Sequence, residues 1–157
     1  MGLLDGDRFA VTWGHPACGI ALFTRGPAGH MAGRWVMMNG THAGSEIHTP
    51  DGPPSPLSSG GTAQLYRLQG TNPPPSGQSY SGMFASSRRG IGLVGLWRVG
   101  EARYSGPGMR SNQYDAFAYG GDACNVAVYT IEADGTLKGA WMTQQNQFVG
   151  FETLTRQ

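Results

Sequence analysis

The sequence predicts a single all-β domain over residues 1–157, an antiparallel meander of about twelve strands that forms a closed barrel or a sandwich. Glycine accounts for 26 residues and aromatic residues for 10% of the chain, a combination typical of strands joined by tight turns. The apolar runs are also short and bounded by turn residues. The third observation is an internal repeat of three four-strand units, for which a β-trefoil is the alternative fold.

The repeat is clearest between the beginning and the end of the chain. At an offset of 106 residues, positions 10–49 match positions 116–155 with twelve identities in forty pairs. Average composition would give roughly three. In this alignment Cys18 falls on Cys124, and Glu46 falls on Glu152.

A shorter motif occurs three times. It reads Leu or Met, x, Gly, x, Trp, with a further Gly nine positions after the Trp, and its tryptophans are Trp35, Trp97 and Trp141. Residues two apart share one face of a strand, so a glycine two positions before the tryptophan leaves room there for a neighbouring ring or backbone. In a helix each such glycine would cost ~1 kcal/mol, and strands are therefore favoured.

Each unit is expected to contain four strands. The first unit (about 9–48) is predicted at 9–14, 18–25, 30–38 and 43–48, the second (about 64–110) at 64–69, 79–87, 91–99 and 102–110, and the third (about 114–155) at 114–120, 124–132, 136–143 and 147–155. The segment 49–61, rich in Pro, Gly and Ser, is predicted to be a surface linker within the domain. The proline-rich segment 71–77 is predicted to be an exposed loop.

Charge and composition argue against several classes of function. Eleven Lys and Arg balance ten Asp and Glu, with no basic stripe, so nucleic acid is not an expected partner. No stretch approaches the ~18 apolar residues of a transmembrane segment. No signal peptide is predicted at the start of the sequence. One lysine against ten arginines suggests a GC-rich bacterial genome.

Several segments resemble a family of small bacterial β-repeat proteins. The segments are Tyr66-Arg-Leu-Gln-Gly70-Thr-Asn-Pro, Tyr80-Ser-Gly82, Leu96-Trp97-Arg-Val-Gly100, Tyr104-Ser-Gly106, Asp134-Gly135-Thr-Leu137-Lys-Gly139-Ala-Trp141 and Gly150-Phe-Glu152-Thr-Leu154-Thr, within residues 64–157. The resemblance implies an extracytoplasmic location and no catalytic residues, and some members carry a fibronectin-binding label. The Gly-x-Trp strands are also similar to those of avidin and lipocalin barrels.

The aromatic residues of the motif are the candidates for a ligand site. Trp35, Trp97, Trp141 and Tyr104 are expected to line a cavity if the barrel holds a ligand, and to pack the core if it does not.

The two cysteines occupy equivalent repeat positions. Buried thiols are the expected state of Cys18 and Cys124, and a mutual disulfide is the alternative if the protein is exported. A catalytic thiol is not expected, because repeat equivalence indicates packing.

Histidines and carboxylates offer weaker candidates. All four histidines lie in the first third of the chain, and His15 with Cys18 has metal-ligand spacing. Scattered surface or turn histidines are nevertheless predicted, with no metal and no cofactor. Glu46 and Glu152 could form an acid/base pair in a hydrolase, but a structural hydrogen-bonding role is favoured by their repeat equivalence.

Two functions follow, and neither is enzymatic. The first is a protein-binding or structural accessory subunit that presents its β-scaffold to a partner protein or to a second copy, since low charge and abundant Tyr, Trp, Ser, Gly and Asn suit a contact surface. The second is a carrier of a small apolar ligand inside a Trp-lined barrel.

Overall fold

The computed structural model describes residues 1–120, 123–146 and 148–157. The strands are β1 (Gly2–Asp5), β2 (Arg8–Trp13), β3 (Gly19–Arg25), β4 (Met31–Met37), β5 (Gly44–Pro50), β6 (Ser55–Pro56), β7 (Thr62–Thr71), β8 (Ser79–Arg89), β9 (Gly92–Val99), β10 (Ala102–Ser111), β11 (Tyr114–Tyr119), β12 (Asn125–Ile131), β13 (Leu137–Met142) and β14 (Val149–Leu154). Among these residues the helical structure is one short 3-10 turn, Pro27–Gly29, and no helix is long and apolar enough to cross a membrane. The all-β prediction is confirmed.

The twelve predicted strands are all present, and their ends lie within two residues of the prediction. Residue 147, at the start of the last predicted strand, lies outside the described residues. The sequence missed β1 and β6, which are short. The predicted linker 49–61 was too long, because Thr49 and Pro50 continue β5 and Ser55–Pro56 pairs with β7 as β6.

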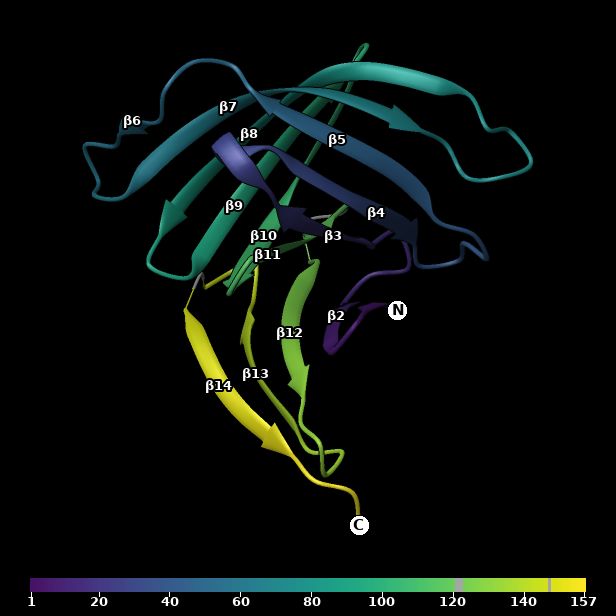
Figure 1. Ribbon diagram of the computed structural model, residues 1–157, viewed down its shortest axis with the longest axis vertical. Helices are drawn as coiled ribbons and strands as arrows, with labels where there is room; N and C mark the ends of the chain where they lie inside the picture. The colour runs from purple at the N-terminus through teal and green to yellow at the C-terminus, as the bar shows by residue number, and fades with distance from the viewer. Residues whose placement is uncertain (121–122, 147) are drawn as a thin grey trace.

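Eight strands close into an antiparallel barrel, which occupies the upper part of Figure 1. Their order around the barrel is β5-β4-β3-β11-β10-β9-β8-β7, and the pairing of β7 with β5 completes the ring. Closure pairs the edges that an open sheet would leave free. The barrel form of the predicted fold is therefore confirmed, and the trefoil alternative does not describe this topology.

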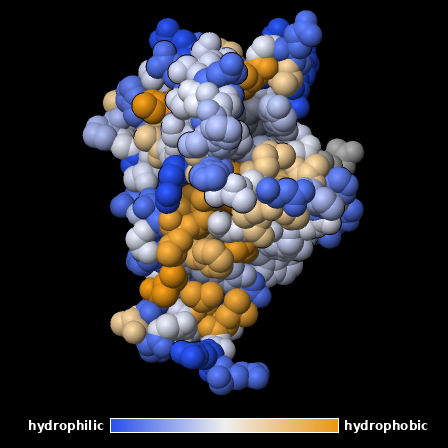
Figure 2. Space-filling view, turned by 90° about the vertical axis from the view of Figure 1, so that its right-hand side faces the viewer, coloured by the Kyte–Doolittle hydropathy of each residue, from blue (hydrophilic) through white to orange (hydrophobic). Residues whose placement is uncertain are grey.

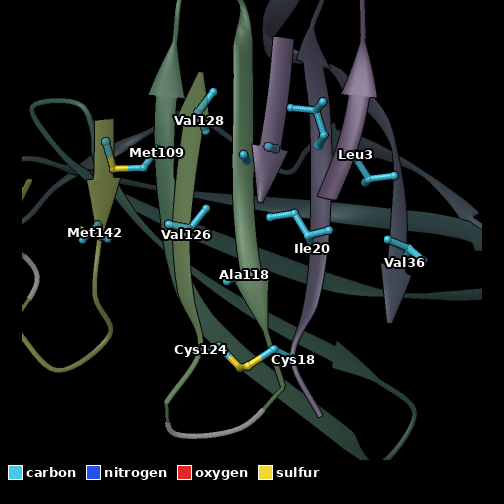
Figure 3. Close-up of a cluster of buried hydrophobic side chains, with 13 residues drawn as sticks. Leu3, Cys18, Ile20, Val36, Met109, Ala118, Cys124, Val126, Val128 and Met142 are labelled. Carbon is cyan, nitrogen blue, oxygen red and sulfur yellow. A yellow bond between two sulfur atoms is a disulfide. The ribbon is translucent and has the colours of Figure 1, made fainter. Parts of the chain in front are cut away.

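A second sheet, with the order β1-β2-β12-β13-β14, lies below the barrel in Figure 1. Side chains alternate between the two faces of a strand, so the residues of β3, β10 and β11 that point out of the barrel meet one face of this sheet. Ile20 and Met109 from the barrel wall pack with Val126, Val128 and Met142 from the second sheet, and all five are buried (Figure 3). This apolar layer is one of two cores, and the other lies inside the barrel.

The chain changes sheets twice, once before and once after the antiparallel meander that forms the barrel. β2 pairs with β12 rather than β3, and β11 pairs with β3 rather than β12. Gly14 and Gly120, 106 residues apart, have φ angles of 124° and 128°, and a Cβ on either would collide with the carbonyl oxygen of Ala123 or Ala17 respectively. Only glycine fits such a crossing, because it tolerates both the positive φ and the close backbone.

A disulfide joins the two crossings. Cys18 and Cys124 are fully buried, their Cα atoms are 5.5 Å apart, and Figure 3 shows the bond at one end of the apolar layer. The structure thus contains the disulfide that the sequence left as the alternative to buried thiols. Cys18 is consequently unavailable as a metal ligand with His15.

The pairing registers of two segments agree at the 106-residue offset. Trp35 of β4 lies opposite Gly44 of β5, and Trp141 of β13 lies opposite Gly150 of β14. The third occurrence of the motif pairs differently, since Trp97 lies opposite Tyr104 rather than the motif's final glycine. A two-residue turn between β9 and β10 sets this tighter register.

Candidate functional site

One end of the barrel contains a cavity of about 450 Å³. Its lining residues are Ala21, Trp35, Met37, Glu46, Asn72, Tyr80, Trp97, Val99, Tyr104 and Tyr119. They come from all eight barrel strands or their ends, at the end that carries the β4–β5, β7–β8 and β9–β10 connections. The volume falls within the range of roughly 300–1,000 Å³ typical of small-molecule sites.

Glycines on neighbouring strands shape the walls. Gly44, Gly70 and Gly19 each lie opposite or beside an aromatic residue, and a Cβ on them would collide with the rings of Trp35, Tyr80 and Tyr119 respectively. Because these glycines have no side chain, the rings lie across the neighbouring backbone instead of filling the lumen. The space between the rings is the cavity.

Packed aromatic rings close the cavity from below. The ring of Trp97 lies 4.5 Å from that of Phe84 and 5.5 Å from that of Phe117, measured between centroids. Phe84 and Phe117 are fully buried, as are Phe23 and Leu68 deeper in the barrel. The middle of the barrel is therefore solid core, so a ligand can enter only from the open end.

Glu46 is the one carboxylate among the lining residues, and it is held by three donors. The Tyr80 hydroxyl donates to its Oε1 over 2.8 Å, and His48 Nε2 and Trp97 Nε1 donate to its Oε2 over 2.7 and 3.3 Å. The Glu46 residue is only 7% exposed. Donors from three other positions in the barrel thus fix one carboxylate at the inner wall of the cavity.

The negative charge of Glu46 acts on both sides of the cavity. The pKa of Tyr80 and the pKa of Tyr119 are raised far above the usual value, first by burial and then by the Glu46 charge. Both phenols therefore stay neutral and remain hydrogen-bond donors. The Trp35 N–H slightly opposes the rise in the pKa of Tyr80, although it makes no hydrogen bond of normal geometry.

Two buried polar groups in the cavity lack a partner within the described residues. They are the Tyr119 hydroxyl and the Trp35 indole N–H. Buried polar groups normally find a partner, so a ligand or an ordered water is expected to complete them.

The opposite end of the barrel has a different electrostatic character. Asp115 is 1% exposed and accepts two hydrogen bonds of 2.7 Å from the Arg110 guanidinium, while Arg25 Nε lies 3.4 Å away. These contacts raise the pKa of Arg110, chiefly through the hydrogen bonds to Asp115. Asp115 is thus paired with arginine side chains, whereas no arginine or lysine is paired with Glu46 among the described residues.

The structure brings together three of the four residues expected to line a cavity. Trp35, Trp97 and Tyr104 line it, but Trp141 lies on β13 in the second sheet, outside the barrel. The expectation for Trp141 was therefore wrong. Its repeat equivalence to Trp35 persists in the strand register, but the second sheet does not close into a barrel around Trp141.

The histidine prediction holds at three positions and fails at one. His15, His30 and His42 are exposed, but His48 is fully buried, with its ring centroid 4.5 Å from those of Phe23 and Phe84. Within the described residues no group of three or more metal-ligating side chains gathers at one place. The Glu46 and Glu152 carboxylates do not face each other as a pair. Glu46 accepts a hydrogen bond from a tyrosine of the barrel, and Glu152 accepts one from a tyrosine of the second sheet.

Tyr80 and Tyr119 are cavity residues that the sequence did not single out. Neither belongs to the three-copy motif. Tyr119 reaches the cavity because β11 pairs with the distant strand β3, and Tyr80 reaches it because β8 pairs with β7 across a long loop. Gly70, which lies opposite Tyr80, was a usable signal for Tyr80. The motif likewise combines an aromatic residue, tryptophan, with a glycine.

The fold and the cavity define this protein as a closed β-barrel with an aromatic, small-molecule-sized site at one end. No family model matches the chain, and no curated protein or solved structure matches it significantly.

Proposed function

We propose that the protein binds a small molecule in the barrel cavity. The observation that carries this proposal is an aromatic space of about 450 Å³ with an inward-facing carboxylate, closed below by Trp97 and Phe84. Apolar walls with a few fixed polar groups are the usual composition of a ligand site. The unpaired hydroxyl of Tyr119 supports the same proposal.

The lining residues favour binding over catalysis. The described cavity wall has one carboxylate and three tyrosines, and it includes no serine, cysteine or lysine that could serve as a nucleophile. Glu46 accepts hydrogen bonds from three side chains of the barrel, which hold it in place. A held carboxylate of this kind recognises a ligand without having to move a proton.

The test uses the neutral apolar fluorophore N-phenyl-1-naphthylamine, whose emission rises in an apolar site. Trp35→Ala is expected to weaken its binding, because it removes one wall of the cavity. Trp141→Ala is the matched control, since Trp141 has the same pairing register but lies in the second sheet. Equal loss in both variants, or no binding to the unmodified protein, would refute the cavity as a ligand site.

A second candidate function is contact with a second copy of this chain through the outer face of the second sheet. Leu4, Trp13 and Leu154 are 54%, 41% and 44% exposed, and side-chain alternation places them on the face opposite the barrel. Figure 2 shows apolar surface gathered over the lower part of the molecule, where Figure 1 draws this sheet. Its edge strands β1 and β14 each have one neighbour among the described strands.

A second copy suits this face because its exposed Leu4, Trp13 and Leu154 can pack against the same residues of another chain about a two-fold axis. The test is light scattering coupled to size-exclusion chromatography. A dimer that Leu4→Lys converts to monomers is expected. A monomer at all concentrations would count decisively against this candidate.

A further inference from the structure

The cavity pairs an anionic group with a wall of aromatic faces. Trp35, Tyr80, Trp97, Tyr104 and Tyr119 all line it. The face of an aromatic ring carries negative electrostatic potential and attracts cations, most strongly for tryptophan. The carboxylate and the faces of two tryptophans and three tyrosines therefore give the cavity groups that attract a cation.

Among the described residues, no arginine or lysine is paired with Glu46. No arginine or lysine is among the lining residues, and the one ion-pair partner found for Glu46 in the described chain is His48. His48 Nε2 donates a hydrogen bond of 2.7 Å to Oε2 of Glu46. A second proton on Nδ1 would leave a buried N–H without an acceptor, because Nδ1 has no partner between Phe23 and Phe84.

The opposite end of the barrel provides an internal comparison. There Asp115, which is also buried, is paired with Arg110 and Arg25 from neighbouring strands. The same fold thus places guanidinium groups beside a buried carboxylate at one end and omits them at the other. Glu46 also keeps acceptor capacity, since its Oε1 accepts one hydrogen bond, from Tyr80.

We propose that the cavity is specific for an organic cation, with an alkylated ammonium group held beside Glu46 and against the rings of Trp35 and Trp97. The inference rests on the proposed ligand-binding function and names its ligand class. The ammonium supplies the charge that the carboxylate lacks, and its alkyl groups cover the aromatic faces. The Tyr119 hydroxyl is free to donate a hydrogen bond to an oxygen elsewhere on the same ligand.

The experiment compares choline with its neutral analogue in which a carbon atom replaces the nitrogen. Both probes have the same shape, so their difference reports the charge alone. Each is titrated against the unmodified protein, with displacement of N-phenyl-1-naphthylamine and tryptophan fluorescence as readouts. Choline is expected to bind at least about ten-fold more tightly than the neutral analogue, as carboxylate and cation–π attraction together require.

Variants localise the effect. Glu46→Gln is expected to remove the preference for choline, while Glu152→Gln keeps it, because the equivalent Glu152 lies in the second sheet and bonds Tyr129. Tyr104→Leu removes a ring from the exposed rim and is expected to weaken choline binding without disturbing the Glu46 network, in which Tyr104 takes no part.

The outcomes separate this inference from the function on which it rests. If the fluorophore binds in the barrel but choline binds no better than its analogue, or does not bind at all, the cation inference is wrong and the ligand-binding function stands. If neither the fluorophore nor choline binds in the barrel, the proposed function itself fails.

Discussion

The indole ring of Trp35 lies over Gly44, its partner across the β4–β5 hairpin, and occupies the space in which a side chain at position 44 would stand. The same relationship joins Trp141 to Gly150 in the second sheet. In the barrel this contact holds a ring flat against the wall and keeps the lumen open. In the second sheet it covers backbone on a face that meets no other sheet.

Gly44→Ala is expected to push the Trp35 ring into the cavity and to weaken ligand binding. The collision should cost about 1–3 kcal/mol of unfolding free energy, as overpacking generally does. Gly150→Ala makes the equivalent collision with Trp141 and should destabilise the protein similarly while leaving binding intact. Chemical denaturation and fluorophore titration of both variants measure the two effects, and equal binding by both variants would contradict the prediction.

Replacing both Cys18 and Cys124 with alanine is expected to lower the unfolding free energy by about 3–5 kcal/mol, because the disulfide closes a very long loop in the unfolded chain. The bond spans 106 residues and pins the two places where the chain changes sheets. Urea unfolding with and without reductant measures the difference. An unfolding midpoint that reductant leaves unchanged in the unmodified protein would show that the bond does not contribute.

Asp115→Asn is expected to destabilise the protein by about 3 kcal/mol or more, because it leaves two guanidinium groups without their buried counter-charge. Arg110 and Arg25 both lose their ion-pair partner in this variant. Glu132→Gln is the matched control, since its pair with Lys138 spans 4.0 Å at an exposed site and should contribute less than about 1 kcal/mol. Denaturant unfolding measures the loss of unfolding free energy in each of the two variants. Equal losses would contradict the account.

The stability of the fold is expected to fall as the pH rises above about 10. Burial raises the pKa of Tyr66, Tyr80 and Tyr119, and burial together with the hydrogen bond to Glu152 raises the pKa of Tyr129 to about 12. Below the usual pKa both folded and unfolded chains hold these protons, so stability is complete. Above it the unfolded chain loses protons that the folded chain retains, and unfolding becomes easier.

Ultraviolet titration at the tyrosinate band, with urea unfolding at about pH 8 and about pH 11, checks this expectation. A fraction of the six tyrosines should ionise only at the pH at which the protein unfolds. Ionisation of all six near the ordinary value, with no loss of stability, would be inconsistent with the burial of Tyr66, Tyr80 and Tyr119.

The strands could be predicted because their signals are local. Alternating apolar residues and turn residues such as Asp134-Gly135 placed all twelve predicted strands, and the structure confirms the role of glycine in the motif, since a Cβ at Gly33 would collide with Phe23. The exchange of β2 and β11 between sheets could not be predicted in this way. It depends on pairings between residues about a hundred positions apart, for which a single sequence carries no local pattern.

The candidate site was predictable in part for the same reason. Trp35, Trp97 and Tyr104 belong to the recurring pattern, whereas His48 and Tyr80 gain their positions from the closure of the barrel. Repeat equivalence also misled, because it gave Trp141 the same expectation as Trp35. The two residues share a register but not a surrounding sheet, and enclosure rather than residue type makes the cavity.

The most direct test of the central claim follows the four indole N–H signals in a nitrogen-resolved nuclear magnetic resonance spectrum during titration with choline. Trp35 and Trp97 line the cavity, while Trp13 and Trp141 lie in the second sheet and serve as controls within the same molecule. The account predicts that the signals of Trp35 and Trp97 shift in a saturable manner and that the other two stay in place. Shifts confined to Trp13 and Trp141, or no shift in any of the four, would contradict it.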